Sequence, residues 1–165
     1  MPVETTITTP LPAGCQPVGV LAYLHDHQAY IRITCPQIIS HRRLSGPTIS
    51  VVVPNDEPCA FEVTDRRPTG QTTYKLTLTN KPDGIDSLVE GKAPTGTMAI
   101  KTRWRVRSDA EAGNVLDEEV EIDSNMITKK IIKSNIEKGH PVYHQTFVAE
   151  AVKWSNSVAG LDERA

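Results

Sequence analysis

Two neighbouring stretches of alternating residues, with opposite charges, most constrain what this chain can fold into. From residue 98 to 107 mostly apolar side chains alternate with basic ones, and from 117 to 123 acidic side chains alternate with Glu118, Val120 and Ile122. A period of two is typical of β-strands that bury one face. Only a short polar segment separates the two stretches, so we expect an antiparallel hairpin that turns around Ala112.

The charges also predict the register of this hairpin. Opposite charges directly across two strands contribute roughly 0.2–1 kcal/mol each, and one register places a basic residue opposite an acidic one four times. The predicted pairs are Arg107–Asp117, Arg105–Glu119, Arg103–Glu121 and Lys101–Asp123. The same register buries Trp104 opposite Val120 and makes Glu118 the one acid of its strand that points inward. We interpret the charge run as a solvated face and not as a nucleic-acid surface.

Composition limits the partners and the compartment. The chain has 165 residues and a formal net charge of −2, so it has the size of one domain and no long-range attraction for nucleic acid or anionic membranes. Its longest apolar run, Val18–Leu24, is too short for a membrane span, and its N-terminus lacks the pattern of a secretory signal. Three widely spaced cysteines without a CxxC pair favour idle thiols over a metal site. We therefore expect a cytoplasmic protein without a metal or a cofactor.

Turn residues and periodicity divide the rest of the chain into elements. The expected helices span 17–25, 26–33 and a longer stretch after Asp123. The expected strands span 3–9, 37–44, 48–53, 59–66, 72–79 and 85–92, in addition to the hairpin. The last helix is amphipathic, with an apolar side made of Ile127, Ile131, Ile132 and Ile136. Gly139 and Pro141 are expected to break or kink it, and residues 156–165 are expected to form a flexible tail after a single domain, 1–155.

This order of a strand, two short helices, a run of antiparallel strands and a long last helix is that of an α+β helix-grip fold. The chain also resembles an uncharacterised family of fungal START-like (SRPBCC) proteins. The segments that carry the resemblance are TTPLPAG, LAYLHDHQAYI, FEVTDR, KPDGI, APTGTMAIKTRWRV and LDEEVEIDSNMITKKIIKSNI, and together they cover about residues 5–152. The resemblance implies a curved antiparallel β-sheet wrapped around a long C-terminal helix, with a cavity for a hydrophobic ligand, but no particular reaction.

The inward positions of the sheet and of the helices predict what lines such a cavity. The predicted ligand-binding residues are Tyr23, Leu76, Met98, Ile100, Thr102, Trp104, Val120, Ile127, Ile131 and Asn135. The alternative is that these side chains pack into a filled core. The small number of large aromatic residues and the inward polar groups argue against a filled core.

The candidates for proton transfer are Glu118, His27, Asp26 and Tyr74. A carboxylate in an apolar interior has to pair, raise its pKa or meet a polar ligand, which makes Glu118 the first candidate. The alternative is that Glu118 reaches water at the open end of the hairpin. Asp26 beside His27 could orient an imidazole for base catalysis, or Asp26 could cap a helix while His27 has a structural role.

Two further histidines, His140 and His144, are four residues apart. This spacing places two side chains on one face of a helix. Pro141 lies between them and interrupts helical geometry, so we do not expect the two histidines to form a site.

Two functions share the expected cavity. The first is a cofactor-independent enzyme, a cyclase or isomerase of secondary metabolism that holds a polyketide or terpenoid intermediate and moves a proton on it. The alternative is a non-catalytic carrier or sensor of a lipid-like small molecule. In both cases the expected partner is a hydrophobic small molecule, with no nucleic acid and no membrane span, and a homodimer stays open. A protein interaction module with a filled core is the third alternative.

Overall fold

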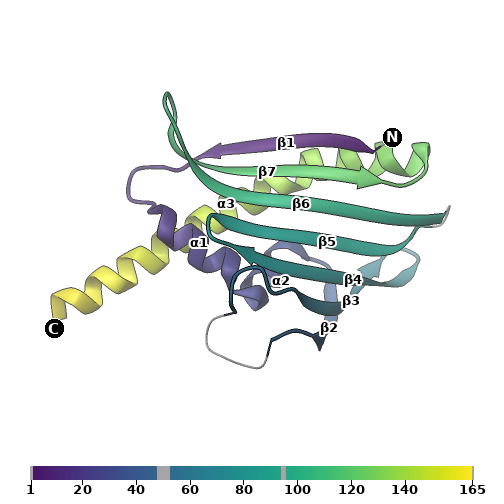
Figure 1. The fold of residues 1–165 in the computed structure, drawn as a ribbon, viewed down its shortest axis with the longest axis horizontal. Helices are drawn as coiled ribbons and strands as arrows, with labels where there is room; N and C mark the ends of the chain where they lie inside the picture. Colours follow the sequence, from purple (N-terminus) through teal and green to yellow (C-terminus); the bar gives the residue numbers. More distant parts are fainter. Residues whose placement is uncertain (1, 48–52, 94–95, 165) are drawn as a thin grey trace.

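The computed structural model describes residues 2–47, 53–93 and 96–164, and within them the chain forms seven strands and three helices (Figure 1). The strands are β1 (Val3–Pro10), β2 (Ile38–Ser45), β3 (Cys59–Arg67), β4 (Gly70–Lys81), β5 (Gly84–Ala93), β6 (Gly96–Asp109) and β7 (Gly113–Asp123). The helices are α1 (Pro17–His25), α2 (His27–Thr34) and α3 (Met126–Arg164). The strand expected at 48–53 lies outside the described residues, except for its last residue. All other expected elements are confirmed in order and type.

The seven described strands form one antiparallel sheet. Their order is β1-β7-β6-β5-β4-β3-β2, so the first strand lies beside the last one and the hairpin β6–β7 lies inside the sheet. The long helix α3 crosses one face of the sheet, and α1 and α2 lie together near one end (Figure 1). Because α3 packs on β1 and β7 and also on α1 and α2, the sheet and the helices enclose one interior. This is the helix-grip architecture that the sequence predicts.

The β6–β7 hairpin has the predicted faces but not the predicted register. Trp104 lies opposite Glu118 instead of Val120, which is a shift of two residues. The turn is centred earlier than expected because Asp109 Oδ1 accepts hydrogen bonds from two turn amides, at 2.9 and 3.0 Å. Gly113 then takes the left-handed conformation, with φ +76°. A shift by two residues keeps every side chain on its face, so Trp104 is fully buried as predicted.

The charges of the hairpin pair on its outer face, with partly different partners from those predicted. The arginines of β6 form ion pairs with acidic residues of neighbouring strands and turns, namely Arg103–Glu119, Arg105–Asp83, Arg105–Asp86 and Arg107–Asp117. Arg107 and Asp117 are thus in contact as predicted, whereas Arg105 pairs with β5 and the turn before it instead of Glu119. Arg103 pairs with Glu119 instead of Glu121, and Lys101 lies opposite Glu121 instead of Asp123. Ion pairs on a solvated face contribute about 0–1 kcal/mol each, so even these partly exposed pairs are weak determinants of register.

An aromatic cluster forms the core where the helices meet the sheet. The Trp104 ring lies edge-on to Phe147 of α3, with 5.3 Å between ring centroids, and edge-on to Tyr30 of α2, at 6.0 Å. Val20 and Leu24 of α1 are fully buried in the same cluster. A second, smaller cluster consists of Val120, Ile122 and Ile136. Burial of each large side chain stabilises the fold by about 1.5–3 kcal/mol, which holds α3 and α2 against the sheet.

Helix α3 is continuous although Pro141 lies inside it, so the expected break at Gly139 and Pro141 is wrong, while a kink there stays a prediction. A proline in a helix interior removes one backbone hydrogen bond and crowds the preceding turn. Here Ile136 before the proline and His144 after it are both buried. Packing on both sides of Pro141 therefore keeps the helix intact across it.

The last turns of α3 extend past the sheet and past α1 in Figure 1. The sequence predicts a flexible tail at 156–165, but the helix continues to residue 164. The flexibility of this segment and the domain boundary at 155 stay predictions. Although α3 is long, no helix among the described residues has an apolar stretch long enough to cross a membrane.

Candidate active site

A cavity of about 110 Å³ lies between the sheet and the helices. Its apolar wall is made by Leu76, Val89, Ile100, Trp104 and Ile136. Its polar wall includes Tyr30, Tyr74, Ser87, Thr102 and His140. Because Tyr74, Val89 and Ile100 are only half-buried, the cavity opens to the surface on their side. The wall thus combines an apolar bed with several hydroxyl groups and one imidazole.

Glu118 of β7 is fully buried between two histidines of α3. Its Oε2 lies 2.5 Å from Nδ1 of His140, and its Oε1 lies 2.9 Å from Nε2 of His144. Glu118 therefore points inward as predicted, and it does not reach water. The His144 side chain is fully buried, whereas the His140 side chain is 21% exposed and lines the cavity. Of the three groups, His140 is the one that a ligand can touch.

The two histidines come together because α3 continues through Pro141. Residues four apart lie on the same helix face, and both rings reach the same carboxylate on β7. The prediction that Pro141 separates His140 from His144 is therefore wrong. Their spacing, considered together with the inward Glu118, was the signal in the sequence that could have found this site.

The carboxylate determines where the protons of this network lie. Burial raises the pKa of Glu118, but the hydrogen bonds from His140 and His144, together with the attraction that these imidazoles exert when protonated, outweigh it, so its pKa lies below its ordinary value. An ionised carboxylate only accepts hydrogen bonds, so His140 donates through Nδ1–H and His144 donates through Nε2–H. Nδ1 of His144 lies 2.8 Å from Oγ1 of Thr9 and accepts its hydrogen bond. Neutral His140 then carries the lone pair on Nε2, which makes this atom a base at the cavity wall.

Trp104 connects the histidine network to a tyrosine of the same cavity. Its ring lies on that of His144, with 4.9 Å between centroids and 38° between planes. Its indole Nε1–H donates to the hydroxyl of Tyr30 at 3.1 Å. Burial raises the pKa of Tyr30, against the effect of its hydrogen bonds with Ser87 and Trp104, so this hydroxyl keeps its proton at neutral pH.

Tyr74 of β4 lines the cavity beside Cys35 of α2's C-terminal end. The Tyr74 hydroxyl and the Cys35 Sγ share a hydrogen bond of 3.2 Å. Burial, followed by the influence of Cys35, raises the pKa of Tyr74, and burial likewise raises the pKa of Cys35. Both groups are therefore neutral at pH 7, and neither provides the base. Tyr74, predicted as a catalytic residue, lies at the cavity as a neutral hydroxyl.

The chain matches one family model over residues 2–153, and this model is described as a domain of unknown function, DUF7053. The chain belongs to the DUF7053 family. A search of curated proteins found no match for it.

Several solved structures resemble this DUF7053 protein. The di-domain ARO/CYC StfQ from the steffimycin biosynthetic pathway is 12% identical, with a TM-score of 0.66 over 96% of this chain and 52% of StfQ, so the chain spans about half of that protein. The Zhui aromatase/cyclase from Streptomyces sp. R1128 is 16% identical, with a TM-score of 0.59 over 92% of this chain and 93% of its own. A START superfamily protein from Mycobacterium smegmatis is 12% identical, with a TM-score of 0.51 over 97% and 98% of the two chains. The DUF7053 protein therefore has the START-like helix-grip fold, while the fungal part of the predicted resemblance stays a prediction.

Two of the acid/base candidates do not line the cavity of this DUF7053 protein. Asp26 caps α2, where its Oδ1 accepts a hydrogen bond of 3.1 Å from the amide of Ala29. His27 is buried edge-on against Phe61, and its Nε2 lies 2.8 Å from Oδ1 of Asn80. Burial lowers the pKa of His27 by more than its hydrogen bond to Asn80 raises it. Both residues thus have structural partners, as the alternative reading of the sequence proposed.

The predicted ligand-binding residues divide into two groups. Those that line the cavity are Leu76, Ile100, Thr102 and Trp104. Tyr23 instead lines a surface groove of about 600 Å³ with residues of α2, β2 and α3, and Met98 lines a second groove of about 550 Å³. Val120 is buried in the smaller apolar cluster. Both grooves are larger than the cavity, but neither contains the histidine network.

In the first turns of α3, the prediction that three ligand-binding residues face inward is wrong. Ile127 and Ile131 are 70% and 57% exposed, and Asn135 is exposed as well. Ile136 and His140, which the prediction left out, line the cavity instead. The apolar half of the helix is wider than the arc that the sheet covers, so only part of it turns inward. Among the described residues, no three His, Cys, Asp or Glu side chains are arranged to hold a metal ion.

Proposed function

We propose that this DUF7053 protein is a cofactor-independent enzyme of the cyclase or isomerase type. It binds a hydrophobic ligand in the cavity and moves a proton on that ligand, with His140 as the base and Glu118 as its buried partner. The observation that carries the proposal is the 2.5 Å contact between Glu118 Oε2 and His140 Nδ1, directly at the wall of a partly apolar cavity. The similarity in fold to two aromatase/cyclases supports the same class of activity.

The network supplies what general base catalysis requires. His140 Nε2 takes a proton from a C–H or O–H group of the ligand, and the imidazolium that forms lies against the ionised Glu118. A buried carboxylate orients such an imidazole and stabilises its charged form. His140 then returns the proton to another atom of the same ligand, so the ligand is rearranged and nothing else is consumed. Positioned acid or base groups accelerate reactions by about 10²–10⁴-fold.

The size of the cavity limits the part of the ligand that reacts. A cavity of about 150 Å³ holds one benzene molecule, and this one measures about 110 Å³. Because this volume is smaller, a short branch or part of one ring enters in the conformation described here, and the rest of the ligand lies toward the open side. A larger polyketide or terpenoid intermediate would place its remainder along the open side next to Val89 and Ile100. Holding the reacting part in one orientation is itself a large share of catalysis.

A non-catalytic carrier or sensor is the second candidate. The observation that favours it is that both ring nitrogens of His144 have buried partners, Glu118 and Thr9, as they also would in a purely structural network. This candidate uses the same apolar wall and requires no proton transfer. Binding alone cannot separate the two functions, so the experiment has to follow a proton.

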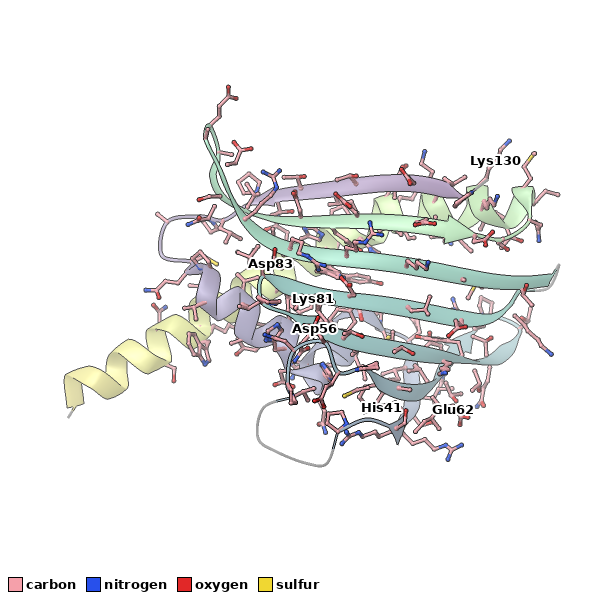
Figure 2. The ribbon with its side chains drawn as sticks, viewed as in Figure 1. His41, Asp56, Glu62, Lys81, Asp83 and Lys130 are labelled. Atoms are coloured by element: carbon pink, nitrogen blue, oxygen red, sulfur yellow. The ribbon has the colours of Figure 1, made fainter. Side chains whose placement is uncertain are left out.

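Exchange of carbon-bound protons separates the two functions without knowledge of the natural ligand. We would incubate the protein with cyclohexanone or 1-indanone in D₂O and follow loss of the α-proton signal by NMR. The proposal predicts exchange above the buffer rate for wild type and a loss of about 10²-fold or more in His140→Gln. His41→Gln is the matched control, because His41 is an exposed histidine on the edge strand β2 (Figure 2). Ligand binding by wild type without any exchange would favour the carrier, and absence of binding, measured by thermal shift, would overturn both.

A further inference from the structure

We propose that Tyr30 is the hydrogen-bond donor that holds an oxygen atom of the ligand, and that the ligand is accordingly an enolisable ketone or a phenol. This inference rests on the proposed function and adds the substrate class and the electrophilic half of the site. It starts from one contact, in which Trp104 Nε1–H donates to the Tyr30 hydroxyl at 3.1 Å. Both residues line the cavity, as does His140.

The indole fixes the role of the Tyr30 hydroxyl. An indole N–H can only donate, so the Tyr30 oxygen uses one lone pair to accept it. The O–H proton of Tyr30 then remains for another acceptor. Accepting one hydrogen bond makes a hydroxyl a stronger donor in turn. Because the Tyr30 side chain is 4% exposed, its acceptor has to come from within the cavity, either from the wall or from a ligand.

Ser87 on the cavity wall is a competing acceptor. Ser87 of β5 is buried, lines the same cavity and interacts with the Tyr30 hydroxyl. A serine hydroxyl both donates and accepts, so it can turn its own proton toward Tyr30 or toward a ligand. A ligand oxygen at this point would therefore meet Tyr30 first and Ser87 beside it.

Opposite charges then develop at two groups of one small cavity. When His140 Nε2 removes a proton from the carbon next to a ketone, the C–H electron pair moves into a new C=C bond, and the C=O pair moves onto oxygen. The enolate oxygen accepts the hydrogen bond of Tyr30 O–H. Return of the proton from His140 to a different carbon gives an isomer. Attack of the enolate carbon on a second carbonyl of the same ligand gives a ring, and the new alkoxide takes the proton from His140.

Donors placed where negative charge develops are effective catalysts in a site that excludes water. Tyr30 meets this requirement because it is neutral, buried and held by Trp104 on α2's side of the cavity. Trp104 also lies on the ring of His144, so one side chain supports both the base network and the donor. His140 thus handles the proton of the reacting ketone, and Tyr30 binds its oxygen.

Binding of 4-nitrophenol tests this inference without any turnover. Its phenolate imitates an enolate, and its absorbance reports whether the bound form is phenol or phenolate. Nitrobenzene has the same nitro-substituted ring without the hydroxyl and serves as the matched probe that cannot form a phenolate. We expect Tyr30→Phe to weaken phenolate binding by about 10- to 100-fold, the range of a hydrogen bond to a charged group, and to leave nitrobenzene binding within about twofold.

Each other result has a defined meaning. Equal phenolate binding by wild type and Tyr30→Phe would overturn the inference and leave the proposed function standing, as would a loss in Ser87→Ala alone. Failure of both probes to bind wild type would overturn the proposed function itself. If Tyr30→Phe does not fold, incorporation of 3-fluorotyrosine at position 30 keeps the ring and makes the hydroxyl a stronger acid. Tighter phenolate binding is then expected, and unchanged binding would refute the role of Tyr30.

Discussion

Replacement of Glu118 by glutamine tests the buried network through stability. Glu118 makes two hydrogen bonds in which the acceptor is charged, and glutamine keeps the shape but offers one acceptor and one donor group. One histidine N–H then faces an amide N–H. Hydrogen bonds to charged groups contribute about 1.5–3 kcal/mol, and an unsatisfied buried donor costs about 1–3 kcal/mol. We expect Glu118→Gln to lower the free energy of unfolding by about 2–4 kcal/mol.

The assay is urea unfolding at pH 7, supported by thermal unfolding, where a domain of this size should lose roughly 2–4 °C per kcal/mol. Glu119→Gln is the matched control. Glu119 is the next residue on the same strand, its side chain is 63% exposed, and it pairs with Arg103 at 3.5 Å. An exposed pair of this kind contributes about 0–1 kcal/mol. Equal losses in the two variants, or no loss in Glu118→Gln, would refute the argument that the buried network stabilises the fold.

The same variant has a predicted pH dependence. The pKa of Glu118 lies below its ordinary value of 4.5 in the folded protein, so the ionised form is favoured by folding. Its stabilising contribution is then fully present above the unfolded pKa and is lost as the pH falls through the lower folded pKa. The difference between wild type and Glu118→Gln should therefore shrink below about pH 4.5. A difference that grows toward acid would contradict the direction of this pKa shift.

Three further substitutions test the surroundings of the site. Gly84→Ala should destabilise the fold by more than about 3 kcal/mol, because a Cβ there would lie 1.7 Å from the backbone oxygen of Trp104. Gly139→Ala should stabilise α3 by about 0.5–1 kcal/mol, because its Cβ would meet only Tyr143 at 3.8 Å. Equal effects of the two variants in urea unfolding would contradict this. Thr9→Val should cost about 1–2 kcal/mol, because it leaves Nδ1 of His144 without its donor, and a neutral result would show that this hydrogen bond is not made.

The sequence predicts well which face of a strand a side chain lies on, but it predicts poorly which residue lies opposite that side chain. A period of two determines which side chains share a face, so the burial of Trp104 and the inward turn of Glu118 follow from it. The register depends instead on the turn, where Asp109 accepts two backbone hydrogen bonds. Exposed charge pairs are too weak to override such a turn, so the predicted pairing is two residues off.

The partners of the site come from distant segments. His140 and His144 are 22 and 26 residues from Glu118 in sequence, and the donor and acceptor of the Trp104–Tyr30 contact are 74 residues apart. Their meeting depends on how α3 and α2 lie on the sheet. A sequence pattern gives the apolar side of a helix but not the narrower arc that a curved sheet covers. For the same reason Ile127 was wrongly predicted to face inward.

Nitrogen-15 NMR of the imidazole side chains tests the central claim most directly, because it identifies which ring nitrogen carries the proton. The account predicts opposite tautomers at neutral pH, with the proton of His140 on Nδ1 and that of His144 on Nε2, and it predicts that Glu118→Gln disturbs both. A cavity ligand should then shift the signal of His140 Nε2. A proton on Nε2 of neutral His140 would contradict the account, since this nitrogen could not act as the base.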